Sequence, residues 1–169
     1  MKLIYLLCFI LFFSSCSKSS INKKTSNIDV LKLEKSKEIW LNHKKDSNNS
    51  YTYFTNFVSW SGFGHETQIT VKNGIFAKRE YTSWNKLKEN TWIETKKDLG
   101  KHKAGAKLKL IDDLYIECKN ILETKDKLSN NIYLGFDKKG LLSYCLYAPK
   151  NCADDCSNGI QIKEIKFTK

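Results

Sequence analysis

Arginine is nearly absent from this basic chain. Arg79 is the single arginine among 169 residues, and lysines make up the rest of the 29 basic residues, which outnumber 18 acidic ones to give a net charge of +11. Arginine is the residue best suited to bidentate contacts with phosphate groups, so its scarcity argues against a domain that reads DNA or RNA. We expect no nucleic-acid partner, and we interpret the lysines as a solvated surface that can rest near anionic lipid headgroups.

The familiar sequence signatures of catalysis are also missing. The chain has no glycine-rich phosphate loop and no G-x-S-x-G segment, and His65-Glu66 is not followed by the second histidine of an H-E-x-x-H motif. The other two histidines, His43 and His102, fall at a predicted helix end and in a basic loop. We therefore predict no catalytic residue and no enzyme activity, and keep a hydrolase with an unrecognised site as an alternative.

Metal-binding patterns are absent in the same way. The cysteines of the C-terminal half lack the paired C-x-x-C spacing of a zinc site. Asp154 and Asp155 lack the regular spacing of an EF-hand loop. We predict no metal site and no cofactor.

The apolar run at the N-terminus is too short to be a standard transmembrane helix. It covers Leu3–Phe13, whereas spanning a bilayer takes roughly 20 residues. Lys2 precedes it and two serines follow it, which is the pattern of a secretory signal. The tetrapeptide Phe13-Ser14-Ser15-Cys16 resembles the lipobox of bacterial lipoproteins, although the usual box has leucine at the place of Phe13.

The lipobox resemblance implies cleavage before Cys16 and acylation of that cysteine. We therefore expect a signal peptide over residues 1–15, a lipidated cysteine with a flexible polar tether over residues 16–27, and one folded domain over residues 28–169. Two or more acyl chains hold a protein stably on a bilayer. No acidic cluster follows Cys16, so we expect a cell-envelope protein that faces the periplasm and contacts the membrane through its anchor.

Four further cysteines remain in the mature chain: Cys118, Cys145, Cys152 and Cys156. An exported protein can oxidise them, and four cysteines allow three pairings. We predict a structural disulfide between Cys152 and Cys156, because redox catalysis favours two intervening residues and this pair has three. Cys118 and Cys145 are left open as two free thiols or one bridge.

The position of Cys145 bears on that choice. It is out of phase with Leu142, Tyr144 and Leu146 in a predicted strand. If those three residues face the helices, Cys145 points away from Cys118.

The pattern of apolar residues predicts an α+β fold with one antiparallel sheet of about six or seven strands and two helices packed on it. We expect helices over residues 28–45 and 110–124. Strands are expected over residues 51–60, 65–72, 91–95, 131–137, 141–148 and 159–168. A change of phase in the last strand predicts a β-bulge near Lys163.

Asn73-Gly74 predicts a hairpin after the second strand. A two-residue loop would place Lys78 opposite Ile69 and so bring charge onto the apolar face. We therefore expect a three-residue loop that pairs Val71 with Ile75 and Ile69 with Ala77, with Gly74 in the left-handed region.

Two aromatic residues are candidates for a binding edge. Trp60 and Phe63 flank the turn that contains Gly62 and Gly64, whereas most other aromatics fit a sheet core. We predict Trp60 and Phe63 to be exposed anchors for a partner.

Several segments together resemble a family of small bacterial exported proteins that is catalogued only as a domain of unknown function. They are Trp40, Tyr51-Thr52-Tyr53, Ile69-Thr70-Val71-Lys72-Asn73-Gly74, Ile111-Asp112-Asp113-Leu114-Tyr115 and the closing hairpin with Asp137. The resemblance covers most of residues 30–168. It implies a fold and an exported location, but no activity.

We expect a membrane-anchored lipoprotein with a non-enzymatic domain that binds an envelope protein or glycan. The first alternative is an inhibitor or immunity-type lipoprotein that blocks an exported enzyme or toxin.

Overall fold

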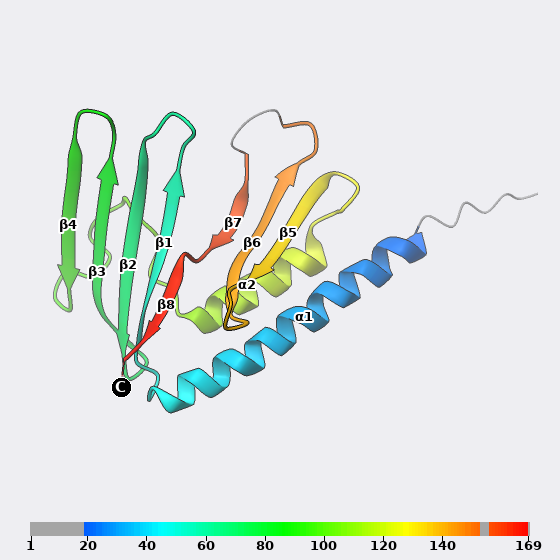
Figure 1. Ribbon diagram of the computed structural model, residues 1–169, viewed down its shortest axis with the longest axis horizontal. Helices are drawn as coiled ribbons and strands as arrows, with labels where there is room; N and C mark the ends of the chain where they lie inside the picture. The colour runs from blue at the N-terminus through cyan, green and yellow to red at the C-terminus, as the bar shows by residue number, and fades with distance from the viewer. Residues whose placement is uncertain (1–18, 153–155, 169) are drawn as a thin grey trace, which may run out of the picture.

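The computed structural model describes residues 19–152 and 156–168 (Figure 1). The predicted signal peptide, Cys16, Asp154 and Asp155 lie outside these residues. The described elements are, in order, α1 (Ser19–Asp46), β1 (Tyr51–Val58), β2 (Gly64–Lys72), β3 (Ile75–Trp84), β4 (Glu89–Thr95), α2 (Ile111–Thr124), β5 (Asn130–Phe136), β6 (Leu142–Pro149), β7 (Asn158–Gln161) and β8 (Glu164–Phe167).

The α+β class is confirmed, but the expected single sheet is wrong. The strands form a five-stranded sheet in the order β4-β3-β2-β1-β8, here called sheet A, and a three-stranded sheet in the order β5-β6-β7, here called sheet B. All neighbouring strands are antiparallel. The two sheets stand side by side with the helices packed near their lower ends (Figure 1).

The two sheets result from a break in the segment that was predicted to be one last strand. The Ile162 N–H donates to the carbonyl of Ser143 in sheet B at 2.6 Å, and the next N–H, of Lys163, donates to the carbonyl of Phe54 in sheet A at 2.8 Å. The phase change near Lys163 is therefore real. It marks the point where the chain leaves one sheet for the other, and not a bulge within one strand.

The hairpin between β2 and β3 also differs from the prediction. Lys72 pairs with Ile75, which leaves a two-residue loop whose Asn73 and Gly74 have φ of 51° and 78°. This is the turn whose twist suits a hairpin. The left-handed Gly74 is confirmed, but both predicted pairings are wrong.

A bulge allows the two-residue loop without placing Lys78 opposite Ile69 on the inner face of the sheet. The register shifts between Thr70 and Val71, so that Ile69 lies opposite Arg79 and not Lys78. The inner face thus receives the one arginine of the chain, whose partner is Glu94.

Helix α1 begins at Ser19, earlier than the predicted Ile28, so residues 19–27 of the expected flexible tether are helical. Its buried positions are Leu33, Ser36 and Trp40, whereas Leu41, expected on the same stripe, is 45% exposed. No helix in the described residues is sufficiently long and apolar to cross a membrane.

Helix α2 matches the predicted segment, and its start is attached to β1 by two tyrosines. The Ile111 N–H donates to the Tyr51 hydroxyl at 3.2 Å, and the Tyr53 hydroxyl donates to the Lys109 carbonyl at 2.7 Å. Burial raises the pKa of Tyr51 to about 12, so its hydroxyl stays protonated while it accepts this bond. The N–H groups in the first turn of a helix have no acceptor within the helix. Tyr51 supplies the acceptor for one of them, that of Ile111.

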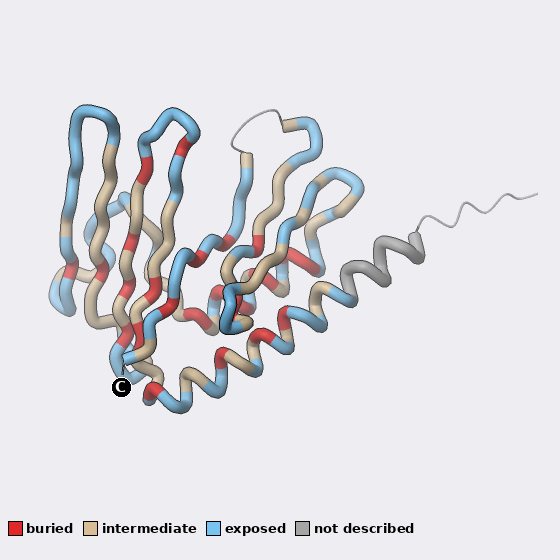
Figure 2. The backbone as a smooth tube through the Cα atoms, viewed as in Figure 1, coloured by how far each residue is buried: buried red, intermediate tan, exposed pale blue. Residues whose placement is uncertain are grey.

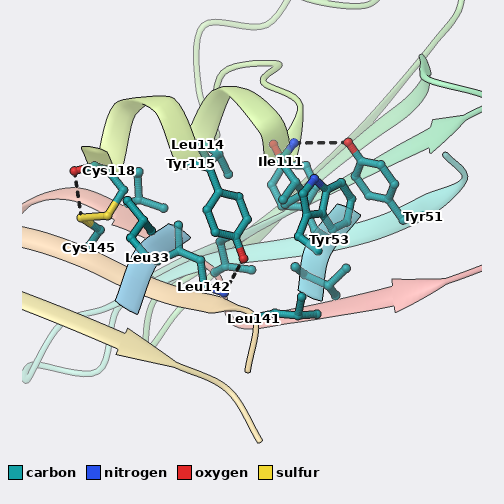
Figure 3. Close-up of a cluster of buried hydrophobic side chains, with 14 of the residues drawn as sticks. Leu33, Tyr51, Tyr53, Ile111, Leu114, Tyr115, Cys118, Leu141, Leu142 and Cys145 are labelled. Carbon is teal, nitrogen blue, oxygen red and sulfur yellow. Dashed lines mark hydrogen bonds between the residues drawn. A yellow bond between two sulfur atoms is a disulfide. The ribbon is translucent and has the colours of Figure 1, made fainter. Parts of the chain in front are cut away.

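The core lies where the two helices meet both sheets. Figure 2 shows buried positions gathered there, while the hairpin tips at the top of the view are mostly exposed. Tyr115 of α2 joins three elements, because its hydroxyl accepts the Leu142 N–H of β6 at 3.1 Å and donates to the Ser36 carbonyl of α1 at 3.2 Å (Figure 3).

A disulfide links Cys118 of α2 to Cys145 of β6, with Cα atoms 5.6 Å apart (Figure 3). The expectation that Cys145 points away is wrong for a local reason. Phe136 pairs with Leu142 and Gly135 pairs with Tyr144, so Ser143 is an extra residue in β6. This bulge places Leu142 and Cys145 on the same buried face, whereas Tyr144 is 41% exposed.

Candidate functional site

A cleft of about 550 Å³ separates sheet A from sheet B above the point where the chain passes between them. We call it the intersheet cleft. Its volume falls within the range of ligand pockets, roughly 300–1,000 Å³. One wall is β1 and the other is β7, and its lining includes Thr55, Asn56, Phe57, Val58, Gly159, Ile160, Gln161, Leu114, Leu146 and Lys107.

The β1 wall carries unpaired main-chain groups. Pairing with β8 ends at Phe54, and among the described residues β1 has no strand partner on that side beyond it. Residues of a strand direct their N–H and C=O groups alternately to the two sides. Since the Phe54 carbonyl faces the β8 side, the N–H and C=O groups of Asn56 and Val58 face the cleft.

The β7 wall has the same property. The N–H of Ile162 points to β6 and that of Lys163 to β1, so by alternation Gly159 and Gln161 direct their main-chain groups into the cleft. Gly159 has φ of +126°, and a Cβ there would clash with the carbonyl of Cys145. A larger residue would push β7 away from β6, so glycine keeps this wall in place.

Four apolar side chains at the end of β1 and in the turn that follows it are exposed: Phe57 (36%), Val58 (58%), Trp60 (85%) and Phe63 (49%). We call these four side chains the apolar patch. Phe57 and Val58 line the cleft. The structure thus places both residues of the predicted binding edge at the surface. It also connects Phe63 with the cleft, since the rings of Phe63 and Phe57 lie 6.0 Å apart and Phe57 lines the cleft.

The turn between β1 and β2 is fixed by its own hydrogen bonds. The Ser59 N–H donates to the Phe63 carbonyl at 2.8 Å, and the Gly62 N–H donates to the Ser59 carbonyl at 3.0 Å. The buried Ser59 hydroxyl also accepts from the Ser61 N–H at 3.3 Å. Trp60 is therefore presented on an ordered turn.

A row of stacked rings runs from the cleft across the inner face of sheet A. Ring centroids are 5.8 Å apart between Phe57 and His65, 5.7 Å between His65 and Tyr81, and 5.2 Å between Tyr81 and Trp92. His102, from the loop after β4, stacks on Trp92 at 4.3 Å. The cleft is therefore bordered by one end of an aromatic surface.

His65 is the histidine that lines the cleft. Its Nδ1 atom is buried without a hydrogen-bond partner, and desolvation by burial lowers its pKa. A catalytic histidine is bonded to a nucleophile or to an orienting carboxylate. In the described residues the contacts of the His65 ring are instead with Phe57 and Tyr81.

The loop over residues 96–110 crosses the inner face of sheet A and forms the lower border of the cleft at Ala106, Lys107 and Lys109. It is attached by a buried ion pair that the sequence did not reveal. Arg79 and Glu94 are 3% and 0% exposed, and two N–H groups of the guanidinium donate to the carboxylate at 2.9 Å each.

The same two residues satisfy the loop backbone. Glu94 accepts the N–H groups of Gly100 and His102 at 2.7 and 2.6 Å, and Arg79 donates to the carbonyls of His102 and Ala106 at 2.8 and 3.0 Å. Burial acts to raise the pKa of Glu94, but these donors outweigh it and hold the pKa at about 2.

His43, Cys152 and Cys156, the other residues that the sequence singled out, are not among the residues that line the cleft. His43 stacks on Phe167 at the end of α1, with ring centroids 4.6 Å apart. Cys152 and Cys156 form the predicted disulfide, with Cα atoms 6.3 Å apart. No group of three or more His, Cys, Asp or Glu residues suited to a metal ion occurs in the part of the chain that the structure describes.

No protein-family model matches this chain, and no curated protein or solved structure does either.

Proposed function

We propose that this chain is a lipid-anchored exported protein whose folded domain binds a partner in the cell envelope and catalyses no reaction. The observation that supports this is the apolar patch, of which Phe57 and Val58 line the intersheet cleft. Contiguous exposed apolar surface on a soluble domain is typical of an interaction site, and aromatic anchors such as Trp60 contribute most to such interfaces.

The ordered turn strengthens the proposal. Side chains and loops that become fixed only on binding cost affinity, whereas a surface that is already ordered avoids that cost. The bonds of Ser59 fix the turn that carries Trp60 and Phe63. The patch is thus built to be presented to a partner.

The anchor is part of the proposal, because Cys16 stands only three positions before the first residue of α1. A helix of 28 residues is about 42 Å long. From Ser19 onward, the connection between an acylated Cys16 and the folded domain would therefore be helical. The partner is then sought among molecules close to the membrane surface.

A second candidate function, the inhibitor or immunity-type lipoprotein, is favoured by the shape of the same turn. Trp60 is 85% exposed at the end of a hydrogen-bonded turn, a geometry suited to insertion into a pocket of an exported enzyme or toxin. Both functions use the apolar patch, and they differ in whether the partner loses activity when bound.

Photo-crosslinking in producing cells tests the patch. A crosslinking residue at Trp60 or Phe63 of the full-length chain should give a discrete product with an envelope protein or with cell-wall glycan. The matched control is Leu87, an apolar side chain that is 97% exposed in another hairpin turn. The proposal fails if positions 60 and 63 give no product, or only the products that position 87 gives.

Membrane fractionation tests the anchor. Cys16→Ser should move the mature protein from the membrane fraction to the soluble fraction, since lipid chains supply the membrane affinity. A Cys16→Ser protein that stays in the membrane fraction at normal size would contradict lipidation at this residue.

A further inference from the structure

We propose that the intersheet cleft binds an extended, acidic polypeptide segment by strand addition, so that the segment pairs through its main chain with β1, β7 or both. This inference rests on the proposed function and assigns the chemical class of the partner. It is carried by the two strand edges that face the cleft and by the charge around it.

The main-chain groups are the first argument. Asn56 and Val58 on one wall and Gly159 and Gln161 on the other direct N–H and C=O groups into the same cleft. An unpaired strand edge is a template for another strand, and strand addition is a common mode of peptide recognition. A segment between these walls would find main-chain partners on both sides, which a glycan or a flat protein surface would not use.

The position of the break supports the same occupant. The main-chain bond between Lys163 and Phe54 closes the lower end of the cleft. Above it, β1 and β7 continue as separate walls of one cavity. An added strand would pair with β1 beyond Phe54, where the pairing of β1 with β8 ends. It would also join sheet A to sheet B where the two separate.

Apolar contacts are available to one face of such a strand. Leu114, Leu146 and Ile160 line the cleft. Side chains of a strand alternate between its two faces, so alternate residues of the segment would contact these apolar groups.

Charge selects an acidic segment. Residues 96–109 contain six lysines and one aspartate, and Lys107 and Lys109 of this loop line the cleft. Among the described lining residues Glu117 is the acidic one, and it is already paired with Lys109. Carboxylates on the segment would therefore be attracted by Lys107 and the other lysines of the loop, and no unpaired carboxylate among the described lining residues would repel them.

The other strand edges of the molecule fit a peptide less well. Apart from β7, the outer strands of the two sheets are β4, β8 and β5, and each offers one edge. The intersheet cleft brings two edges together beside apolar and basic side chains, and Phe57 and Val58 of the apolar patch line it.

A designed peptide tests the proposal directly. The probe is a fluorescently labelled octapeptide of four Val-Glu repeats with blocked ends, titrated with the full chain and followed by fluorescence anisotropy. The same peptide with N-methyl groups on alternate residues keeps its side chains but loses main-chain donors. A Val-Lys repeat of equal length tests the charge. We expect saturable binding of the Val-Glu peptide and at least roughly tenfold weaker binding of both other peptides, as expected from the loss of one or two hydrogen bonds or of charge pairing.

A matched pair of proline variants locates the site. Asn56→Pro removes a donor that faces the cleft and spares the pairing of β1 with β2. Thr91→Pro is the control, because by the same alternation Thr91 directs its N–H away from β3 on the outer edge of β4. Asn56→Pro should weaken peptide binding at least roughly tenfold, and Thr91→Pro should leave it unchanged, with equal melting temperatures showing that both variants fold.

Three results would overturn strand addition in the cleft. They are absence of binding by the Val-Glu peptide, equal binding of its N-methylated form, and equal binding by Asn56→Pro. Concentration-dependent self-association that Asn56→Pro abolishes would overturn it as well, because a second copy of the chain would then be the occupant. If the peptide fails while crosslinks form at Trp60 and Phe63, the proposed envelope binding stands and the assigned class of partner is wrong.

Discussion

The two regions on either side of the intersheet cleft are stabilised by different means. Around α1 and α2, the apolar core that both sheets share is closed on the sheet B side by the Cys118–Cys145 disulfide. At the β3–β4 end of sheet A, the coil on its inner face is attached to β3 and β4 by the buried charges of Arg79 and Glu94. The two regions differ because their main-chain N–H and C=O groups find hydrogen-bond partners in different ways. Helices and strands satisfy their own polar groups, whereas a coil that crosses a buried face needs other partners.

Breaking the ion pair should have the largest effect. Arg79→Met leaves the fully buried Glu94 charge without its partner, and we expect the free energy of unfolding to fall by about 3 to 5 kcal/mol. Denaturant unfolding measures the loss, and hydrogen exchange should show residues 96–110 opening first. Lys119→Met is the control, since its ion pair with Glu34 is 45% and 41% exposed, and solvent screens such a pair so that its loss should be much smaller. Equal losses for the two variants would contradict the role given to the buried pair.

Removing the interior disulfide should destabilise the other region. The Cys118→Ala/Cys145→Ala double variant opens a cross-link between residues 27 positions apart, for which loop-closure entropy predicts a loss of about 3.5 kcal/mol. The Cys152→Ala/Cys156→Ala variant removes a cross-link between residues four positions apart. Its free energy of unfolding should fall by about 1.5 kcal/mol less than that of the Cys118→Ala/Cys145→Ala variant. Unfolding curves of both variants decide this, and the reverse order would refute it.

Acid should weaken the two regions unequally. The pKa of Glu94 is about 2 in the folded protein against an ordinary value of 4.5, so the unfolded chain takes up its proton first as the pH falls. The stabilisation is present above about pH 4.5 and is lost towards pH 2, at up to about 1.4 kcal/mol per pH unit. Glu94→Gln should remove this part of the acid dependence, whereas the Cys118→Ala/Cys145→Ala variant should keep it. Urea unfolding at several pH values tests both, and an unchanged acid dependence in Glu94→Gln would be the contrary result.

The smallest expected effect concerns the residue that connects α2 to sheet A. Tyr51→Phe leaves the buried Ile111 N–H without its acceptor, and should cost about 1 to 2 kcal/mol of unfolding free energy. Tyr133→Phe, which removes a hydroxyl from a side chain that is 47% exposed, should be nearly neutral in the same measurement. A neutral Tyr51→Phe would mean that water replaces the tyrosine as acceptor.

Features with a strong local pattern were predictable from the sequence. The buried stripe of α2, the exposure of Trp60 and Phe63, and the left-handed Gly74 all follow from spacing or turn chemistry. The short disulfide between Cys152 and Cys156 was predicted from its spacing and its loop setting.

Features that depend on an inserted residue were not predictable in the same way. The bulge in the β2–β3 hairpin and the bulge at Ser143 each move the following side chains to the other face. The first hid the Arg79–Glu94 pair, and the second hid the approach of Cys145 to Cys118. A solitary arginine in the strand that faces Ile69 was the available signal, but it carries meaning only once the register is known.

The peptide groups of Ile162 and Lys163 bond to different sheets, and this arrangement has a mechanical consequence. Beyond this segment β1 and β7 are not paired with each other in the described residues, and Phe57 and Val58 at the far end of β1 line the cleft. Four residues of strand beyond Phe54 reach about 13 Å, so a relative rotation of about 10° would move the far end of β1 by about 2 Å while leaving the bonds of Ile162 and Lys163 nearly unchanged. By this geometry, a small change of angle between the two sheets at Ile162 and Lys163 changes the width of the cleft most at Val58.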